Sequence, residues 1–180
     1  MYIIKVGGGA AIDEAAYARF AVDLADLHEA GTPFVVVHGG NAEFSRLSDR
    51  LGIPPRMITN DKGRVSRYTD RETIDAMLMT YCGKVNKTIV AAFQQAGINA
   101  VGLSAIDGRI ATGRRKSVLR GTEDGTTKVL RDDHAGSMRA PARFMSSTKP
   151  GKLVLIVSPS SMRTGDFAAR PICPMARADG

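Results

Sequence analysis

The sequence is poor in the residues that mark secreted, zinc-stapled or membrane-spanning proteins. Its two cysteines, Cys82 and Cys173, form no CxxC pair, so neither a disulfide framework nor a structural zinc site is indicated. No apolar run approaches the roughly 20 residues that cross a bilayer. The apolar segment 2–6 follows the first methionine at once, which leaves no room for a signal peptide. We therefore expect a cytoplasmic protein with no membrane partner.

Several ligand-binding signatures are also missing. The chain has neither the six-position glycine fingerprint of dinucleotide-binding folds nor a GxxxxGK[ST] phosphate loop, which disfavours nicotinamide enzymes and Walker-type nucleotidases. Its three histidines show no metal-ligand spacing, so we expect no metal ligated by the protein itself. Interleaved aromatic and basic residues are absent too, and we expect no nucleic-acid partner.

The charge is unevenly distributed along the 180 residues, a length that suits one core-bearing domain. Residues 137–180 carry seven Arg and Lys against two Asp, a net charge of +5, whereas residues 1–136 carry 18 basic and 16 acidic groups. After residue 136 the hydrophobic periodicity also fails, apart from one apolar run at 153–157. This break divides the chain into an ordinary globular segment and an atypical basic tail.

The globular segment predicts an α/β fold. Apolar strands are expected at 2–6, 34–37 and 99–103, with helices between them that imply parallel crossovers. Segment 56–68 has the pattern of a hairpin, and 69–97 that of a long helix that begins with a Thr69-x-x-Glu72 capping box. Residues 108–128 predict an antiparallel ribbon. We expect a three-layer sandwich whose three strands are adjacent, with helices on both faces.

Two glycine turns follow buried strands and precede helices: Gly7-Gly8-Gly9, and His38-Gly39-Gly40. Such turns direct consecutive backbone N–H groups into one concavity and add the positive end of a helix dipole, so they hold anions. Glycine also ends strands for purely steric reasons, and each turn alone is weak evidence. Two of them on neighbouring strands favour an anion site, with one turn for an acceptor and the other, at Gly7, Gly8 and Gly9, for phosphates.

Lys5 lies within the first apolar strand, just before the first glycine turn. A buried lysine is rare without an anionic partner, which makes Lys5 a candidate cation for a phosphoryl group. The alternative is a strand lysine that reaches solvent. Because phosphoryl transfer depends mainly on positioning and charge neutralisation, one lysine between two amide turns would suffice.

These motifs, in order and spacing, resemble the N-terminal half of the amino-acid kinase family. The matching stretches are Ile4-Lys5-Val6-Gly7-Gly8, Val36-Val37-His38-Gly39-Gly40, Gly83-Lys84-Val85-Asn86-Lys87 and Ala100-Val101-Gly102-Leu103-Ser104 with Asp107-Gly108. They are most similar to the acetylglutamate kinase branch. Ser66-Arg67-Tyr68-Thr69 further resembles kinases that act on aminoadipate or glutamate attached to a LysW-type amino-group carrier protein.

The resemblance implies a fold and a set of roles. The fold would be the αβα sandwich of this family, incomplete at the C-terminus. Lys5 would stabilise the phosphoryl group in transfer from ATP, bound with Mg²⁺, and Arg67 would bind a second substrate carboxylate through paired hydrogen bonds. The side-chain carboxylate would lie against the backbone of Gly39, Gly40 and Asn41. The family usually has a third glycine at position 41, and asparagine tolerates left-handed backbone better than most residues.

Basic residues of the predicted ribbon provide a second candidate surface. An acidic carrier protein would dock beside the active site, and Arg114, Arg115 and Lys116 would steer it. The alternative is an ordinary solvated face. The resemblance also implies a homodimer that pairs through the long helix, with Met77 and Tyr81 at the centre of the interface.

The resemblance covers residues 1 to about 136, which we interpret as the acceptor-binding and dimerisation half. The nucleotide-site motifs of the family are not found in 137–180. We hypothesise that a frameshift near codon 137 replaced the remainder, and translation of the other two reading frames tests this. The expected function is a carboxylate kinase of lysine or arginine biosynthesis. The alternatives are an N-acetylglutamate kinase, or a non-catalytic fragment that retains substrate binding and dimerisation.

Overall fold

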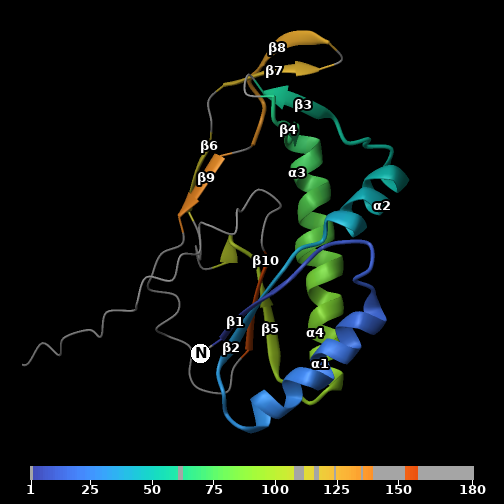
Figure 1. The fold of residues 1–180 in the computed structure, drawn as a ribbon, viewed down its shortest axis with the longest axis vertical. Coiled ribbons are helices and arrows are strands. Elements are labelled where there is room, and N and C mark those ends of the chain that lie inside the picture. The colour runs from blue at the N-terminus through green and yellow to red at the C-terminus, as the bar shows by residue number, and fades with distance from the viewer. Residues whose placement is uncertain are drawn as a thin grey trace, which may run out of the picture.

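The computed structural model describes residues 2–60, 63–107, 112–115, 118–123, 125–134, 136–139 and 153–157 (Figure 1). The helices are α1 (Glu14–Glu29), α2 (Asn41–Leu51), α3 (Arg71–Leu78), the π-helix η1 (Met79–Val85) and α4 (Asn86–Gln95). The strands are β1 (Tyr2–Val6), β2 (Phe34–His38), β3 (Met57–Asn60), β4 (Val65–Arg67), β5 (Ala100–Leu103), β6 (Thr112–Arg115), β7 (Leu119–Glu123), β8 (Thr126–Leu130), β9 (Gly136–Arg139) and β10 (Leu153–Val157). Within these residues, no helix is both long and apolar enough to span a bilayer.

The main sheet contains four parallel strands in the order β1-β2-β10-β5. Every residue of β2 is buried, as expected for an apolar strand in the interior of a parallel sheet. The predicted strands at 2–6, 34–37 and 99–103 are confirmed. Their predicted adjacency is wrong for the last one, because β10 from the basic segment pairs with both β2 and β5. The apolar run at 153–157 in the sequence is this strand.

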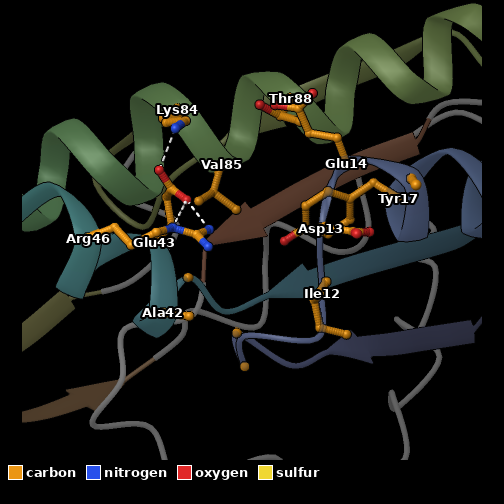
Figure 2. Close-up of a pocket in the computed structure, with 14 residues that line it drawn as sticks. Ile12, Asp13, Glu14, Tyr17, Ala42, Glu43, Arg46, Lys84, Val85 and Thr88 are labelled. Atoms are coloured by element: carbon orange, nitrogen blue, oxygen red, sulfur yellow. Dashed lines mark hydrogen bonds and ion pairs between the residues drawn. The ribbon is translucent and has the colours of Figure 1, made fainter.

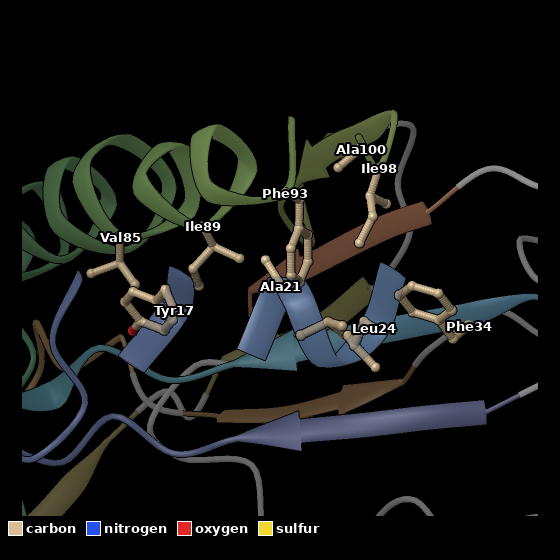
Figure 3. Packing of buried hydrophobic residues seen from close by; sticks show 10 residues of the cluster. Tyr17, Ala21, Leu24, Phe34, Val85, Ile89, Phe93, Ile98 and Ala100 are labelled. Atoms are coloured by element: carbon tan, nitrogen blue, oxygen red, sulfur yellow. The ribbon is translucent and has the colours of Figure 1, made fainter. Parts of the chain in front are cut away.

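The core lies between this sheet and the pair of helices α1 and α4 (Figure 3). Alternate residues of β1 and β2 point to the helices, as the two-residue period of a strand requires, and Ile4, Phe34 and Val36 belong to this cluster. Phe93 of α4 is fully buried, and its ring centroid lies 5.8 Å from that of Phe20. The face of α1 that bears Tyr17, Ala21 and Leu24 packs on the sheet.

The opposite face of the main sheet is less covered by the described residues. Ile3 and Val101 on this face are 54% and 50% exposed. The described helices that pack on the sheet, α1 and α4, share the other face (Figure 1). The expectation of helices on both faces is thus met on one face only within the described part of the chain.

A second sheet of order β4-β3-β7-β8 lies beyond the main sheet (Figure 1). The predicted hairpin at 56–68 is confirmed, since β3 and β4 pair antiparallel with Gly63 in the left-handed region. The antiparallel ribbon predicted at 108–128 is found in part, as the antiparallel pair of β7 and β8. β7 pairs with β8 and with β3, whereas β6 pairs with β9.

The ends of the helices follow local chemistry. Asp13 caps α1 by accepting a hydrogen bond from the N–H of Ala16 at 2.8 Å, and Gly52 ends α2 in the left-handed conformation. Asp70, not the predicted Thr69, caps α3 by accepting from the N–H of Thr73. The long helix is confirmed, but its middle is the π-helix η1, a form that often occurs at functional sites.

Candidate functional site

The two glycine turns lie side by side at the carboxyl ends of β1 and β2, where ligands bind in open parallel sheets. Val6 is opposite His38 in the strand register, and the N–H of Gly39 donates to the carbonyl of Val6 at 3.0 Å. The structure therefore joins the predicted phosphate turn and the predicted acceptor turn directly.

The turns approach each other so closely that side chains would not fit between them. A Cβ built on Gly8 would lie 2.7 Å from the nitrogen of Asn41 and closer still to the nitrogen of Gly40. A Cβ on Gly40 would lie 3.2 Å from side-chain atoms of Tyr81 and Val85. Close packing against backbone excludes a side chain at Gly8, whereas at Gly40 a Cβ would press on the side chains of Tyr81 and Val85; neither glycine has a left-handed φ.

The second turn opens directly into a helix. Gly40 is the N-cap of α2 and offers no side-chain cap, and the N–H of Ala42 donates to the carbonyl of Gly8 at 2.8 Å. Asn41 begins the helix in right-handed conformation, so the left-handed backbone considered for position 41 does not occur. The first turns of such helices present N–H groups and a positive dipole end to an anion.

Arg67 from β4 reaches the start of α2. Its Nη1 donates to Oδ1 of Asn41 at 3.2 Å, and its guanidinium carbon lies 4.4 Å from the ring centroid of Phe44. The Nε atom is buried and has no hydrogen-bond partner among the described residues. Burial lowers the pKa of the Arg67 guanidinium. A carboxylate beside the exposed Arg67–Asn41 contact would accept hydrogen bonds from the guanidinium.

Lys5 is exposed, and the described residues give it no ion pair. The expectation that it is a buried lysine is wrong. β1 is an edge strand of the main sheet, and Lys5 belongs with Ile3 to the less covered face. Its position near the end of β1, two residues before Gly7, still places a cation next to the glycine turns.

A cavity of about 410 Å³ lies on the helix side of the turns (Figure 2). Gly8, Gly9 and Gly40 contribute to its wall, whereas Lys5, Gly39, Asn41 and Arg67 do not. Its other lining residues come from α1 with its preceding loop, from α2 and from the helix that carries Lys84: Ile12, Asp13, Glu14, Ala15, Tyr17, Ala42, Glu43, Arg46, Lys84, Val85 and Thr88.

An ion-pair cluster closes one side of this cavity. Glu43 pairs with both Lys84 of η1 and Arg46, one helical turn further along α2 (Figure 2). The hydrogen bond from Lys84 is the main cause that lowers the pKa of the Glu43 carboxyl. This cluster ties the start of α2 to the π-helical segment.

His38 is fully buried behind the second turn. Burial lowers the pKa of its imidazole, which is neutral in consequence. Its Nδ1 lies 3.0 Å from the carbonyl oxygen of Gly39, and its Nε2 lies 3.2 Å from Nδ2 of Asn86. An acceptor carboxylate that is already ionised has no proton to lose, so its attack needs no general base. His38 therefore fits a structural role.

The predicted basic cluster is divided between two environments. Arg114 is exposed on β6, whereas Arg115 donates from Nε to the carbonyl of Asp133 at 2.9 Å and from Nη2 to that of Arg131 at 2.8 Å. Arg115 therefore braces the segment after β8. Lys116 lies outside the described residues.

Sequence reasoning did not find the side chains that hold the turns in place. Glu43 and Arg46 have the ordinary three-residue spacing of a helical ion pair, which gives no hint of Lys84. Lys84 and Asn86 lie in a motif that carried the resemblance, yet their residue types alone assign them no role. Only the fold places Asn86 against His38, 48 positions earlier.

Comparison with known proteins identifies the family. The profile of the amino acid kinase family matches residues 1–153. The chain belongs to the amino acid kinase family. It is 46% identical over 136 residues to a LysW-aminoadipate kinase of Deinococcus radiodurans, and 44% identical over 138 residues to one of Thermus thermophilus. An acetylglutamate kinase of Desulfotalea psychrophila is 42% identical over 106 residues, which are 59% of this chain and 34% of that protein.

The first two matches cover 76% and 77% of this chain but only 46% and 50% of the relatives, so the chain spans about half their length. Solved structures support the same fold. The protein smu.665 of Streptococcus mutans has a TM-score of 0.56 at 18% identity, over 87% of this chain and 58% of that chain. An N-acetylglutamate synthase of Neisseria gonorrhoeae has 0.54 at 20% identity, over 87% and 34%. The expected α/β fold of the amino-acid kinase type is confirmed.

Proposed function

We propose that this chain is the acceptor-binding half of a kinase that transfers the γ-phosphoryl group of ATP to a side-chain carboxylate. The acceptor would be aminoadipate or glutamate attached to a LysW-type carrier protein. The contact between Arg67 and Asn41 carries this proposal, because it places an incompletely paired guanidinium beside amide groups at the start of α2. Such a pair of groups suits a substrate with two carboxylates.

The two turns would divide the work. Gly39, Gly40 and Asn41 would hold the reacting carboxylate, and Arg67 the other one. The exposed ammonium of Lys5 and the backbone of Gly7, Gly8 and Gly9 would face the transferring phosphoryl group, where positive charge favours the transition state over the ground state. Close approach of a phosphate is compatible with Gly8, where any side chain would fill the space between the turns.

ATP would bind with Mg²⁺, which neutralises charge on the phosphates. The described residues contain no cluster of three His, Cys, Asp or Glu that could hold a metal ion, so the metal would enter with the nucleotide. The family's nucleotide motifs were not found in this sequence. Activity of the chain by itself is therefore a separate question from acceptor binding.

The relatives from Deinococcus radiodurans and Thermus thermophilus are both named as kinases of LysW-linked aminoadipate. We infer an acidic carrier protein as partner here, with Arg114 on β6 as part of its docking surface. Arg115 would contribute indirectly, because its hydrogen bond to the carbonyl of Asp133 holds the segment after β8 in place.

A homodimer remains a proposal, but the residues for its interface change. Tyr81 is buried against Phe44 and Ala76 within the chain, so a charge there would disrupt the fold itself. Leu78 and Met79 on the same long helix are 37% and 51% exposed. Met79→Glu should convert a dimer into a monomer in sedimentation while the helix content stays unchanged. A dimer that persists would exclude this face.

Acceptor titrations distinguish the candidate functions. Carrier-linked aminoadipate should bind the ¹⁵N-labelled chain and shift the amide signals of Gly40 and Asn41. N-acetylglutamate is the competing acceptor, favoured by the similarity to the Desulfotalea enzyme, and preferential binding of it would overturn the carrier-linked assignment. ATP consumption is then measured with the acceptor that binds. Binding without consumption would identify a non-catalytic fragment.

A further inference from the structure

A chain of three hydrogen-bonding groups lies directly behind the second glycine turn. It runs from the carbonyl of Gly39 to His38 and on to Asn86, the first residue of α4. His38 is 0% and Asn86 1% exposed, so the hydrogen bond between these two side chains is buried, whereas the contact with the carbonyl of Gly39 is part-buried. None of the three groups lines the cavity described above.

Donor and acceptor chemistry gives this chain a single direction. The carbonyl of Gly39 can only accept, so Nδ1 of His38 carries the proton. The neutral ring then has an unprotonated Nε2, which can only accept, and Asn86 must present its Nδ2 amide group to it. The order is therefore Asn86 Nδ2–H to His38 Nε2, and His38 Nδ1–H to Gly39 carbonyl.

The Asn86 side chain packs closely against the backbone of β5. Its Oδ1 is directed at Gly102 of β5, where any Cβ would overlap it. That oxygen is buried and has no partner among the described residues, which is a cost of the arrangement. A glycine at 102 and an asparagine at 86 therefore form a matched pair.

Peptide planarity connects this chain to the acceptor site. In a trans peptide the carbonyl of one residue and the N–H of the next point in opposite directions. With its carbonyl held on the imidazole, Gly39 turns the N–H of Gly40 away from His38, to the side where Gly8 and the start of α2 meet. Rotation of this peptide would replace the Gly40 N–H by a carbonyl, which repels a carboxylate.

We propose that Asn86, acting through His38, is a positioning residue that fixes the Gly39–Gly40 peptide with the Gly40 N–H presented to the acceptor carboxylate. This rests on the proposed function for the identity of the ligand. The orientation of the peptide itself does not depend on it.

The first test needs no variant. Long-range ¹H–¹⁵N correlation of the labelled chain should show the His38 ring neutral, with its proton on Nδ1, and loss of the signals in His38→Gln assigns them. A proton on Nε2 would reverse the donor order and overturn the proposal.

The second test asks whether a partner on Nε2 matters. Asn86→Leu should shift the amide signal of Gly40 and weaken binding of carrier-linked aminoadipate about tenfold, the equivalent of one hydrogen bond. Asn86→Asp should restore most of the affinity, with both ring nitrogens protonated, because a carboxylate on Nε2 holds the imidazolium in the same orientation. Asn99→Leu, which changes an exposed asparagine after α4, is the matched control and should bind like the parent.

These outcomes separate the two proposals. If the parent binds no acceptor, the proposed function fails, while the His38 proton and the Gly40 amide shift still test the positioning role. If the parent binds and Asn86→Leu binds equally well with an unshifted Gly40 signal, the positioning role is excluded. Lost affinity that Asn86→Asp does not recover would reduce Asn86 to a packing residue.

Discussion

The two glycine turns share a sequence pattern but differ in structure. The first turn, Gly7 to Gly9, is followed by a loop, and α1 starts only at Glu14 with Asp13 as its cap. The positive end of that helix dipole is thus already compensated by two acidic side chains. The second turn enters α2 at once, with no side-chain cap at Gly40, and the acidic residue of its first turn, Glu43, is paired with Lys84 and Arg46. Of the two, the second is the better anion site.

Their packing differs in the same way. A Cβ on Gly7 or Gly9 would meet nothing within 4 Å, whereas one on Gly8 would collide with the second turn. The second turn is held from behind by His38 and Asn86 and from the side by Arg67 and Tyr81. Consecutive glycines after a strand therefore do not identify an anion site without knowledge of where the helix begins and what lies behind the turn.

Alanine substitutions within the first turn should include the largest effect on stability, and that effect should differ between Gly8 and Gly9. Gly8→Ala forces the two turns apart, at a cost of about 1–3 kcal/mol in the free energy of unfolding. Gly9→Ala enters open space without a left-handed φ and should stay within about 0.5 kcal/mol of the parent. Urea denaturation measures both. Equal losses for the two variants would mean that the turns do not meet as described.

Charge removal on either side of the turns should affect acceptor binding unequally. Arg67→Ala should weaken the acceptor by about 10- to 100-fold, the range for hydrogen bonds to a charged group, and Arg67→Lys should recover little because lysine lacks the planar fork. Lys5→Ala should leave acceptor affinity nearly unchanged and lower turnover in an intact kinase. Calorimetric titration gives the affinities. A larger loss for Lys5→Ala would reverse the assignment of the turns.

The sequence was sufficient for elements whose signals are local. Asp13, Gly31 and Gly52 mark helix ends through their own backbone and side-chain chemistry, and all three do so in the structure. The burial of 34–37 follows from an unbroken apolar run. The site at the start of α2 was located because strand, glycine turn and helix are consecutive in the chain.

Predictions that depended on distant parts of the chain were less successful. β10 lies between β2 and β5 because it pairs with strands that are more than 50 residues earlier in the chain, such as Leu153 with Ala100 of β5. No local sequence signal identifies such a distant partner. The exposure of Lys5 depends on what covers one face of the sheet, and the apolar neighbours of Lys5 in β1 do not reveal that. The chain from Gly39 to Asn86 likewise requires the fold to bring α4 behind β2.

The smallest expected effect concerns the ion pairs that hold α2, the helix of the second turn. The pKa of Glu43 is lowered, chiefly by its hydrogen bond from Lys84 and further by Arg46. A carboxyl group whose pKa is lower in the folded state stabilises the fold fully above its unfolded value near 4.5, and this contribution is lost as the pH falls through the folded value. Because Lys84 and Arg46 are 52% and 61% exposed, we expect at most about 1 kcal/mol.

Glu43→Gln should therefore lower the stability at pH 7 slightly and make it less dependent on pH below 5. Lys84→Met should reproduce most of this change, and the double variant should add little, since both substitutions remove the same pair. Urea denaturation between pH 7 and pH 3 measures the slopes. Among the described residues, the first turn of α1 has no such ion pair with a neighbouring helix. There the side chain of Asp13 caps the helix by accepting from the backbone N–H of Ala16. If Glu43→Gln kept the full acid dependence of the parent, the ion pairs of Glu43 would contribute nothing measurable to the stability. The second turn would then be held by packing and by the hydrogen-bonded chain from Gly39 to Asn86 alone.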